Sequence, residues 1–259
     1  MLTILVINSK GGSGKTTLAT NLASYYATRK IQTAIMDYDP QGSSIQWLRL
    51  RPDEAIKIHG ANAAPAKGAV PLRSTHAWVP MDTEITIIDA PAGAKGLLLQ
   101  DLVRKSNFIV IPVAPSPIDI HATADFIKEL FLFGGARTSN AKIAVVANRV
   151  RNSTSTVYEA LQRFLNSLKL PFLTSIHDSE NYLYASEQGL GVFEMDKSAT
   201  IAERQELVPI LKWLNGQFPD RFASRLEDDA SSLEGSRKFA MGMQNFTVLS
   251  STGRFKDYS

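Results

Sequence analysis

The fold is decided by the stretch Leu2-Thr-Ile-Leu-Val-Ile-Asn-Ser-Lys-Gly-Gly-Ser-Gly-Lys-Thr-Thr17. Its apolar, β-branched part predicts a buried strand over residues 2–8, and a helical pattern follows over residues 15–30. The glycines between them let backbone N–H groups close around phosphate oxygens, and the start of the helix carries partial positive charge. The stretch therefore predicts a phosphate-binding loop between a strand and a helix.

Two side chains complete the chemistry of this loop. Lys15 supplies a mobile positive charge for the β- and γ-phosphates of a nucleotide, and the Thr16 hydroxyl can hold Mg²⁺. The strict pattern G-x-x-x-x-G-K-[ST] is not met, because Ser9 stands where its first glycine belongs. A second lysine, Lys10, precedes the glycine pair instead. The alternative, a glycine-rich turn that binds nothing, does not account for Gly, Lys and Thr in register after a strand.

Strand and helix patterns alternate through most of the chain. Further strands are expected at 33–36, near 56–59, and at 85–89, 108–113, 143–148 and 172–176. Further helices are expected at 45–50, within 51–80, and near 95–105, 118–133, 155–168 and 201–214. This alternation predicts an α/β fold with a doubly wound, mainly parallel sheet and helices on both faces.

Composition limits the classes of chemistry. The chain has 259 residues, of which 44% are hydrophobic, so it can bury a sizeable core. It has no cysteine, which excludes disulfides, thiolate metal sites and cysteine nucleophiles. No long apolar run and no signal peptide precede the first strand, so we expect a cytoplasmic protein without a membrane segment. With a net charge of +3, any basic surface must be local.

The acidic residues of interest follow predicted strands. Asp37 and Asp39 come after the second strand, and Asp89 comes after four apolar residues of another. In parallel α/β sheets ligands bind at the carboxyl ends of the strands, so these carboxylates should meet the phosphate loop. We assign Asp37 and Asp89 to the Mg²⁺ shell, through water, and Asp39 to positioning the attacking water. The reverse assignment of Asp37 and Asp39 stays open.

Three motifs together resemble those of one protein family. The segment Lys10-Gly-Gly-Ser-Gly-Lys-Thr-Thr17 is similar to the deviant Walker A motif of the ParA/MinD ATPases. Asp37-Tyr-Asp-Pro-Gln-Gly-Ser43 resembles their Walker A′ motif, and Asp89-Ala-Pro-Ala-Gly93 their Walker B motif. The DPQGS sequence is typical of the ParA branch. The resemblance runs over roughly residues 1–215 and implies a P-loop NTPase fold of the SIMIBI type.

The resemblance also implies how the site works. Two ATP molecules would be sandwiched with Mg²⁺ in a homodimer, and Lys10 would reach the phosphates bound by the other subunit, as an arginine finger does. Lys10, Lys15 and Asp39 would be the catalytic residues. Asn148 matches the family position that hydrogen-bonds adenine, although a turn residue at a strand end is an alternative. The ATP-binding residues would be Lys10, Gly11, Gly12, Ser13, Gly14, Lys15, Thr16, Thr17 and Asn148. The metal residues would be Thr16, Asp37 and Asp89.

Non-specific binding of double-stranded DNA is another property that the resemblance implies. It needs a basic surface, and residues 137–169 hold six cations against one acidic residue, Glu159. We take these cations as candidate DNA contacts: Arg137, Lys142, Arg149, Arg151, Arg163 and Lys169. The helix-turn-helix extension of some plasmid ParA proteins has no counterpart in the sequence, so we expect no operator-specific reading. The family often has Arg where this chain has His177.

The leading hypothesis is a ParA-type positioning ATPase. ATP would drive dimerisation and association with the nucleoid, and a ParB-like protein or cargo adaptor would stimulate the weak ATPase. The cargo is open between a plasmid, a chromosome locus and an assembly such as carboxysomes or chemosensory clusters. A MinD-like, membrane-cycling regulator is the alternative, and a bacterial tyrosine kinase is disfavoured because the tail has only Tyr258.

We expect two regions in the chain. Residues 1–222 would form the ATPase domain. Residues 223–259, where Ser and Gly are frequent and hydrophobic periodicity is lost, would form an extended or loosely packed C-terminal tail.

Overall fold

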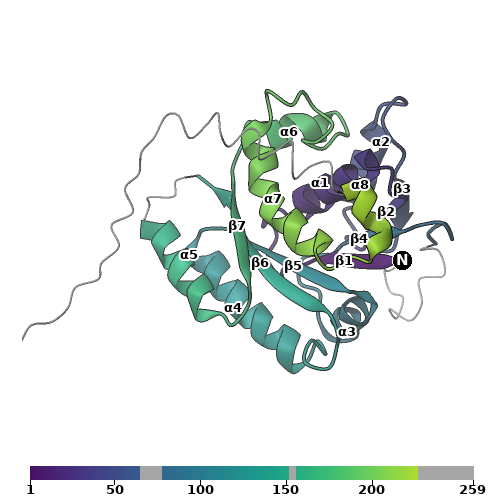
Figure 1. Ribbon diagram of the computed structural model, residues 1–259. Helices are drawn as coiled ribbons and strands as arrows, with labels where there is room; N and C mark the ends of the chain where they lie inside the picture. The colour runs from purple at the N-terminus through teal and green to yellow at the C-terminus, as the bar shows by residue number, and fades with distance from the viewer. Residues whose placement is uncertain (65–77, 152–155, 227–259) are drawn as a thin grey trace, which may run out of the picture.

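A computed structural model describes residues 1–64, 78–151 and 156–226. Its centre is a seven-stranded sheet in the order β3-β2-β4-β1-β5-β6-β7, and every neighbouring pair is parallel (Figure 1). The strands are β1 (Leu2–Val6), β2 (Thr33–Asp37), β3 (His59–Asn62), β4 (Ile85–Asp89), β5 (Phe108–Val113), β6 (Lys142–Val150) and β7 (Phe172–His177). The predicted doubly wound parallel sheet is confirmed.

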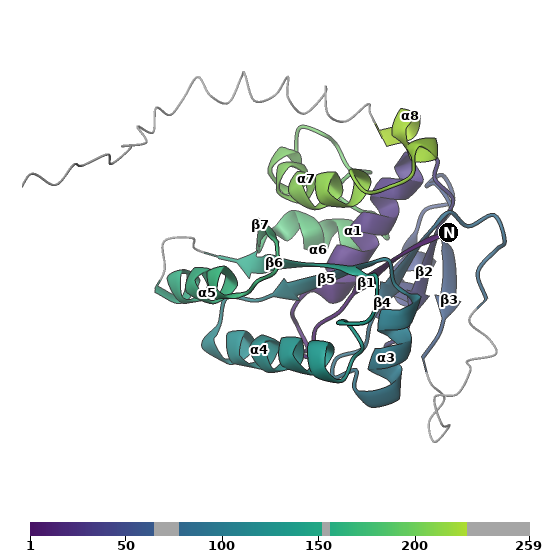
Figure 2. The same cartoon turned by 60° about the horizontal axis from the view of Figure 1, so that its bottom comes forward.

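Helices cover both faces of this sheet (Figure 2). One face carries α1 (Lys15–Thr28), α2 (Ser43–Leu50), α6 (Glu180–Glu187), α7 (Ile201–Asn215) and α8 (Ala223–Leu226). The other carries α3 (Gly96–Lys105), α4 (Pro117–Leu132) and α5 (Thr156–Ser167). A short 3₁₀ turn, Asp220–Phe222, precedes α8.

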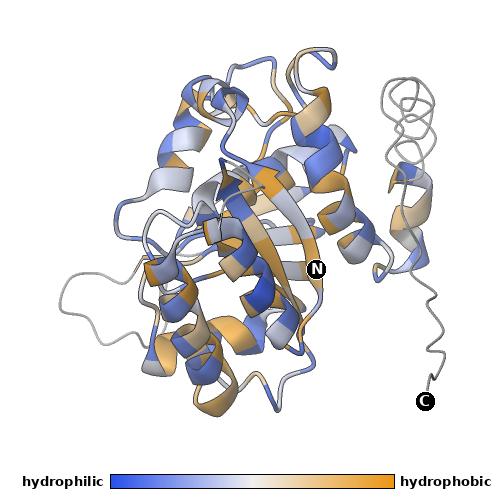
Figure 3. Ribbon diagram, turned by 90° about the vertical axis from the view of Figure 1, so that its left-hand side faces the viewer, coloured by the Kyte–Doolittle hydropathy of each residue, from blue (hydrophilic) through white to orange (hydrophobic). Residues whose placement is uncertain are grey.

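Each face has its own hydrophobic core, because the strand residues alternate between the two faces. Ile4 and Val6 of β1 pack towards α1 and α7, whereas Leu5 and Ile7 pack towards α3 and α4. Figure 3 shows the same arrangement as orange strands between helices that are partly blue. Both faces of β1 are thus buried, which explains why its sequence is a continuous apolar run rather than an alternating one.

The central position of β1 places the phosphate loop in the middle of one sheet edge. β1 lies between β4 and β5, and the chain continues from β1 towards one side of the sheet and from β5 towards the other. Such a switch point is where open parallel sheets bind ligands at the carboxyl ends of their strands.

Most predicted boundaries agree with the structure to within three residues, and two expectations differ. The edge strand near 56–59 lies later, at His59–Asn62. The short helix expected within 51–80 is absent from residues 51–64 and 78–80, and the rest of that range lies outside the described residues. The sequence offered no clear apolar periodicity in this range. Helix α6 was not predicted, because only Tyr182 and Ala185 are buried on it.

The fold continues four residues past the boundary predicted at 222. In α8, the Arg225 guanidinium pairs with the Glu84 carboxylate at 2.8 Å, just before β4. Leu226 packs against the core cluster that contains the fully buried Phe222. The remainder of the predicted tail, residues 227–259, lies outside the described residues, and its extended character stays a prediction.

Candidate nucleotide-binding site

The loop between β1 and α1 has the geometry of a phosphate cradle. Gly12 and Gly14 take left-handed conformations, with φ of 78° and 82°, which only glycine adopts without strain. Gly14 precedes α1 without any side-chain cap, so the first N–H groups of the helix stay available to an anion. The loop predicted from the sequence is therefore present, with its helix start directly behind it.

Lys15 lies inside this loop. Its side chain is largely buried, and its ammonium group donates to the backbone carbonyl of Lys10 at 3.0 Å. Burial lowers the pKa of Lys15, and the nearby carboxylates of Asp89 and Asp39 partly oppose that shift. Lys10 itself is partly exposed and makes no ion pair with the described part of the chain. The Lys15 side chain thus lines the loop, Lys10 lies at its rim, and the roles predicted for the two lysines stay predictions.

Strand register brings the two predicted metal carboxylates together. Asp37, the last residue of β2, is the register partner of Asp89, the last residue of β4. The Thr16 hydroxyl donates to Asp89 Oδ2 at 2.8 Å. Burial raises the pKa of Asp89 to about 7, the Thr16 hydrogen bond lowers it, and the neighbouring Asp37 raises it. The carboxylates, the hydroxyl and the phosphate loop therefore share one edge of the sheet.

The two carboxylates have different surroundings. Asp37 Oδ2 accepts hydrogen bonds from the backbone N–H groups of Ser44 and Ile45, at 3.0 and 3.2 Å. Its Oδ1 accepts from the Asp39 N–H at 2.9 Å. Asp37 therefore fixes the start of α2 and the turn before it. Its predicted place in the metal shell stays a prediction, as does the water-positioning role of Asp39, whose carboxylate accepts the Gln41 N–H at 2.9 Å.

Asp89 is the carboxylate with an unused oxygen. Asp89 Oδ1 and the Ser44 hydroxyl are both buried, and Ser44 lies close enough to lower the pKa of Asp89, but neither atom makes a hydrogen bond of full geometry within the described residues. Buried polar atoms are rarely left without partners, so a water or an ion is expected here. The described residues hold no group of three or more His, Cys, Asp or Glu side chains that could bind a metal by themselves. One carboxylate with a hydroxyl suits Mg²⁺, which keeps several waters and binds through nucleotide phosphates.

Two consecutive residues of β6 lie against the back of the phosphate loop. The buried Asn148 amide donates from Nδ2 to the Ser13 carbonyl at 2.8 Å. Arg149 donates from Nη1 to the Gly12 carbonyl at 3.3 Å. The side-chain nitrogen of Asn148 is thus hydrogen-bonded to the loop in this structure. The contact with adenine predicted for Asn148 stays a prediction.

The six candidate DNA contacts do not form a single patch. Lys142 begins β6 and Arg149 lies near its end, so about 23 Å of strand separates them. Lys169 and Arg137 lie in loops that precede β7 and β6, at the edge opposite the phosphate loop. Arg149 and Arg151 both pair with Asp178 at the phosphate-loop edge. The six cations are therefore spread over both edges of the sheet, and the expected basic surface over 137–169 stays a prediction. The role of these six cations in DNA binding stays a prediction.

Two residues of the site escaped the sequence analysis, and Arg149 was given a different role. Ser44 follows the DPQGS motif directly and is fully buried beside Asp89. Asp178 follows β7, and its carboxylate pairs with Arg149. Arg149 was named from the sequence as a residue at a strand end and as a candidate DNA contact. Position at a strand end was an available signal for Asp178, because polar residues are found at strand ends elsewhere in the chain.

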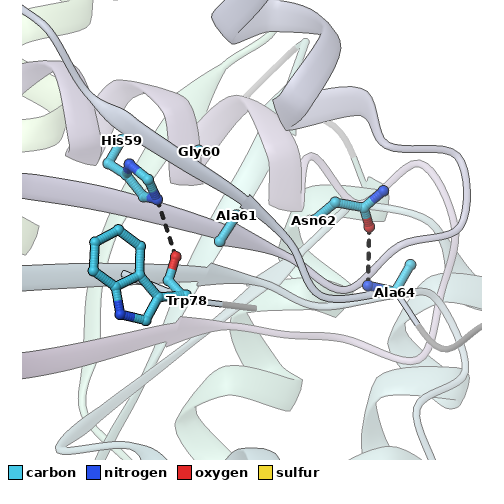
Figure 4. A pocket seen from close by; sticks show the side chains of 6 residues that line it. All are labelled: His59, Gly60, Ala61, Asn62, Ala64 and Trp78. Carbon is cyan, nitrogen blue, oxygen red and sulfur yellow. Dashed lines mark hydrogen bonds between the residues drawn. The ribbon is translucent and has the colours of Figure 1, made fainter. Parts of the chain in front are cut away.

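A shallow pocket lies elsewhere, at the sheet edge formed by β3 (Figure 4). It is lined by His59, Gly60, Ala61, Asn62, Ala64 and Trp78. His59 Nε2 lies 3.0 Å from the Trp78 carbonyl oxygen, and their rings meet edge to face. The lining includes one titratable side chain and adjoins residues outside the described ranges, so we assign it no chemistry. No helix in the described residues has the length and apolar character needed to cross a bilayer.

Comparison with known proteins agrees with this geometry. Residues 4–192 match the family model described as "CobQ/CobB/MinD/ParA nucleotide binding domain". The chain is 29% identical over 200 residues to "Maintenance of carboxysome distribution protein A" of Halothiobacillus neapolitanus, covering 74% of this chain and 87% of that protein. It is 32% identical over 125 residues to "Chromosome-partitioning ATPase Soj" of Thermus thermophilus, covering 47% of this chain and 50% of that protein.

Solved structures share the fold. The apo structure of McdA from "Cyanthece" superposes with a TM-score of 0.61 at 17% identity, covering 82% of this chain and 99% of that one. A putative plasmid partition protein of Borrelia burgdorferi bound to AMPPNP gives a TM-score of 0.62 at 15% identity, covering 82% of this chain and 98% of that one. At these identities the likeness establishes the P-loop NTPase fold.

Proposed function

The chain belongs to the CobQ/CobB/MinD/ParA family of nucleotide-binding domains, and we propose that it is a ParA-type positioning ATPase. ATP binding would drive homodimerisation and sequence-independent binding to double-stranded DNA, and hydrolysis would reverse both. The observation that carries the proposal is the meeting of the Lys15 loop with Asp89 and Thr16 at one sheet edge, with Lys10 at its rim. Relatives named for carboxysome distribution and chromosome partitioning support the positioning role.

Different described residues would bind the phosphates of ATP, hold the metal ion and orient the attacking water. Backbone N–H groups of the loop and the Lys15 ammonium would hold the phosphates, as such loops do. Thr16 and Asp89 would hold Mg²⁺, and when bound this ion neutralises the charge that develops on the transferred phosphoryl group. Asp39 would orient the attacking water. Lys10 would contribute its positive charge to the nucleotide of the partner subunit, which makes turnover depend on the dimer.

The partners follow from this cycle. We propose a homodimer that associates with the nucleoid in its ATP state, in the cytoplasm, and an adaptor that stimulates hydrolysis. The adaptor would be a ParB-like protein or a cargo protein. The two relatives quoted above suggest a carboxysome or a chromosome locus as the kind of cargo.

Retention on DNA tests the proposal. The chain should bind a random-sequence duplex with ATP and Mg²⁺, and should release it with ADP. Binding should weaken steeply with salt, because each phosphate contact releases about one counterion. ATP-dependent pelleting with liposomes, with no retention on DNA, would overturn the proposal in favour of a MinD-like membrane cycle.

A paired variant tests where the DNA lies. Arg151→Ala with Arg163→Ala removes two exposed cations from the β6 and α5 region and should lower the DNA affinity and the salt slope. The control, Arg104→Ala with Lys128→Ala, removes the same charge from α3 and α4. If the first pair leaves both quantities unchanged and the control lowers them, the DNA surface lies on α3 and α4 instead.

A further inference from the structure

Arg149 has a backbone conformation that side chains rarely adopt. Its φ is 58°, and within the described residues Lys30 is the other non-glycine residue with a positive φ. A left-handed conformation is unfavourable for an arginine, and such strain persists where the surroundings fix it. Arg149 lies within β6 in the stretch between Ala147 and Val150 where the register with β7 shifts, and its side chain reaches the phosphate loop.

Contacts at both ends of the guanidinium group hold it there. Arg149 Nη1 donates to the Gly12 carbonyl at 3.3 Å, and Nε donates to Asp178 Oδ1 at 3.3 Å. Asp178 Oδ2 accepts from Arg151 Nε at 2.9 Å, and the Asp178 N–H donates to the Val150 carbonyl at 3.2 Å. Asp178 is thus anchored to β6 by its backbone and by its side chain. An anchored carboxylate in turn fixes the direction in which Arg149 points.

The hydrogen bonds from β6 decide how the loop peptides face. In a trans peptide the C=O and the next N–H point in opposite directions. Arg149 holds the Gly12 carbonyl, so the Ser13 N–H points away from Arg149. Asn148 holds the Ser13 carbonyl, so the Gly14 N–H points away from Asn148. Neither N–H has an acceptor within the described residues. Two neighbouring N–H groups are thereby kept available for phosphate oxygens.

We propose that Arg149, anchored by Asp178, is a positioning residue for nucleotide binding. It acts through the Gly12 carbonyl and need not touch the nucleotide itself. The role rests on the proposed ATP binding at this loop. It differs from a DNA contact, because the guanidinium is engaged by the loop and by Asp178 rather than presented to solvent alone. The proposed role also accounts for the left-handed backbone of Arg149, because an extended residue at this position would direct the side chain elsewhere.

The test is the affinity for a fluorescent ATP analogue, measured on the full chain with Mg²⁺ and without DNA. Arg149→Ala should weaken binding about fivefold, the effect of losing a partly exposed, charge-assisted hydrogen bond. Arg149→Lys should recover part of that loss. Asp178→Asn should weaken binding about two- to threefold, since Arg149 stays but loses its anchor. Arg104→Ala, which removes another arginine paired with an aspartate, should bind as wild type does.

Two further measurements separate positioning from other roles. KM for ATP should rise in Arg149→Ala while kcat at saturation stays within about twofold, as for a residue that acts on ground and transition states alike. Arg149→Gly, which relieves the backbone strain, should bind as weakly as Arg149→Ala. Wild-type affinity in Arg149→Ala or in Arg149→Gly would overturn the proposal. If the wild-type chain fails to bind the analogue, the proposed function fails before this inference is reached.

Discussion

Replacing Gly14 by alanine should both destabilise the fold and weaken nucleotide binding. Gly14 has φ of 82°, a conformation that costs alanine about 1 kcal/mol. An added Cβ would also lie 2.0 Å from Asn148 Nδ2 and 3.3 Å from Asn148 Cγ. No side chain tolerates a contact of 2.0 Å, so the Asn148 amide must move by more than an ångström. That movement breaks its buried hydrogen bond to the Ser13 carbonyl.

The size of the effect follows from these two contributions. Leaving a buried donor and acceptor unpaired costs about 1–3 kcal/mol. Added to the backbone strain, the free energy of unfolding should fall by about 2–4 kcal/mol. The loop that moves also binds the phosphates, so affinity for ATP should fall at least tenfold, which corresponds to about 1.4 kcal/mol.

Urea unfolding followed by circular dichroism measures the stability, and titration with a fluorescent nucleotide measures the affinity. Gly11→Ala is the matched control, because its added Cβ would meet no atom within 4 Å and its φ is not left-handed. It should change the stability by less than about 0.5 kcal/mol. In a double-mutant cycle, Gly14→Ala should lower the free energy of unfolding by at least about 1 kcal/mol less in an Asn148→Ala background than in the wild-type chain. Equal stability of Gly14→Ala and Gly11→Ala, or strict additivity, would refute the reasoning.

Three further predictions concern the site. Lys15→Ala should abolish detectable ATP binding, whereas Lys10→Ala should keep ATP binding and lower the turnover rate at least about tenfold. Nucleotide titration and phosphate release, measured in parallel, test this. Equal losses of binding and turnover in the two variants would contradict the separate roles. Asp39→Ala should retain ATP-dependent dimerisation, seen by light scattering, and should block turnover; normal turnover would remove Asp39 from the mechanism. For Asp89 the pKa of about 7 lies above its ordinary value of 3.8, so its protonated form favours the folded state. The nucleotide-free chain should therefore lose stability as the pH rises from about 4 to 7, and Asp89→Asn should remove that loss. Mg²⁺-dependent nucleotide affinity should rise over the same range, because the ion needs the ionised carboxylate. If the difference in free energy of unfolding between wild type and Asp89→Asn, measured in urea, does not change with pH, the raised pKa is contradicted.

Much of the fold could be predicted because its signals are local. The strands at Ile85–Asp89 and Phe108–Val113 are uninterrupted apolar runs, and their predicted bounds match the structure. The helix at Gly96–Lys105 has a regular apolar stripe with Leu99, Leu102 and Val103 buried. β3 was misplaced because His59–Asn62 is short, contains a glycine and lies at the sheet edge, where few side chains are buried. Edge strands carry little hydrophobic pattern of their own.

The sequence by itself determined the phosphate loop, the alternation of strands and helices, and the three motifs. Glycine conformations, apolar periodicity and helix starts are properties of a few consecutive residues, so they can be read along the chain. The second lysine, Lys10, was also visible from the sequence, and it first suggested that two subunits share the site.

Only the tertiary structure decided which side chains meet. Asp37 lies in register with Asp89, but the Asp37 carboxylate accepts hydrogen bonds from the start of α2. Asp89 Oδ1 makes no hydrogen bond of full geometry within the described residues. The tertiary structure separated Lys142 from Arg149 by the length of β6, and it brought Arg149 against Gly12, 137 residues away in the sequence. Such contacts depend on strand order and register, which the packing of the whole sheet fixes and which short stretches of sequence do not encode.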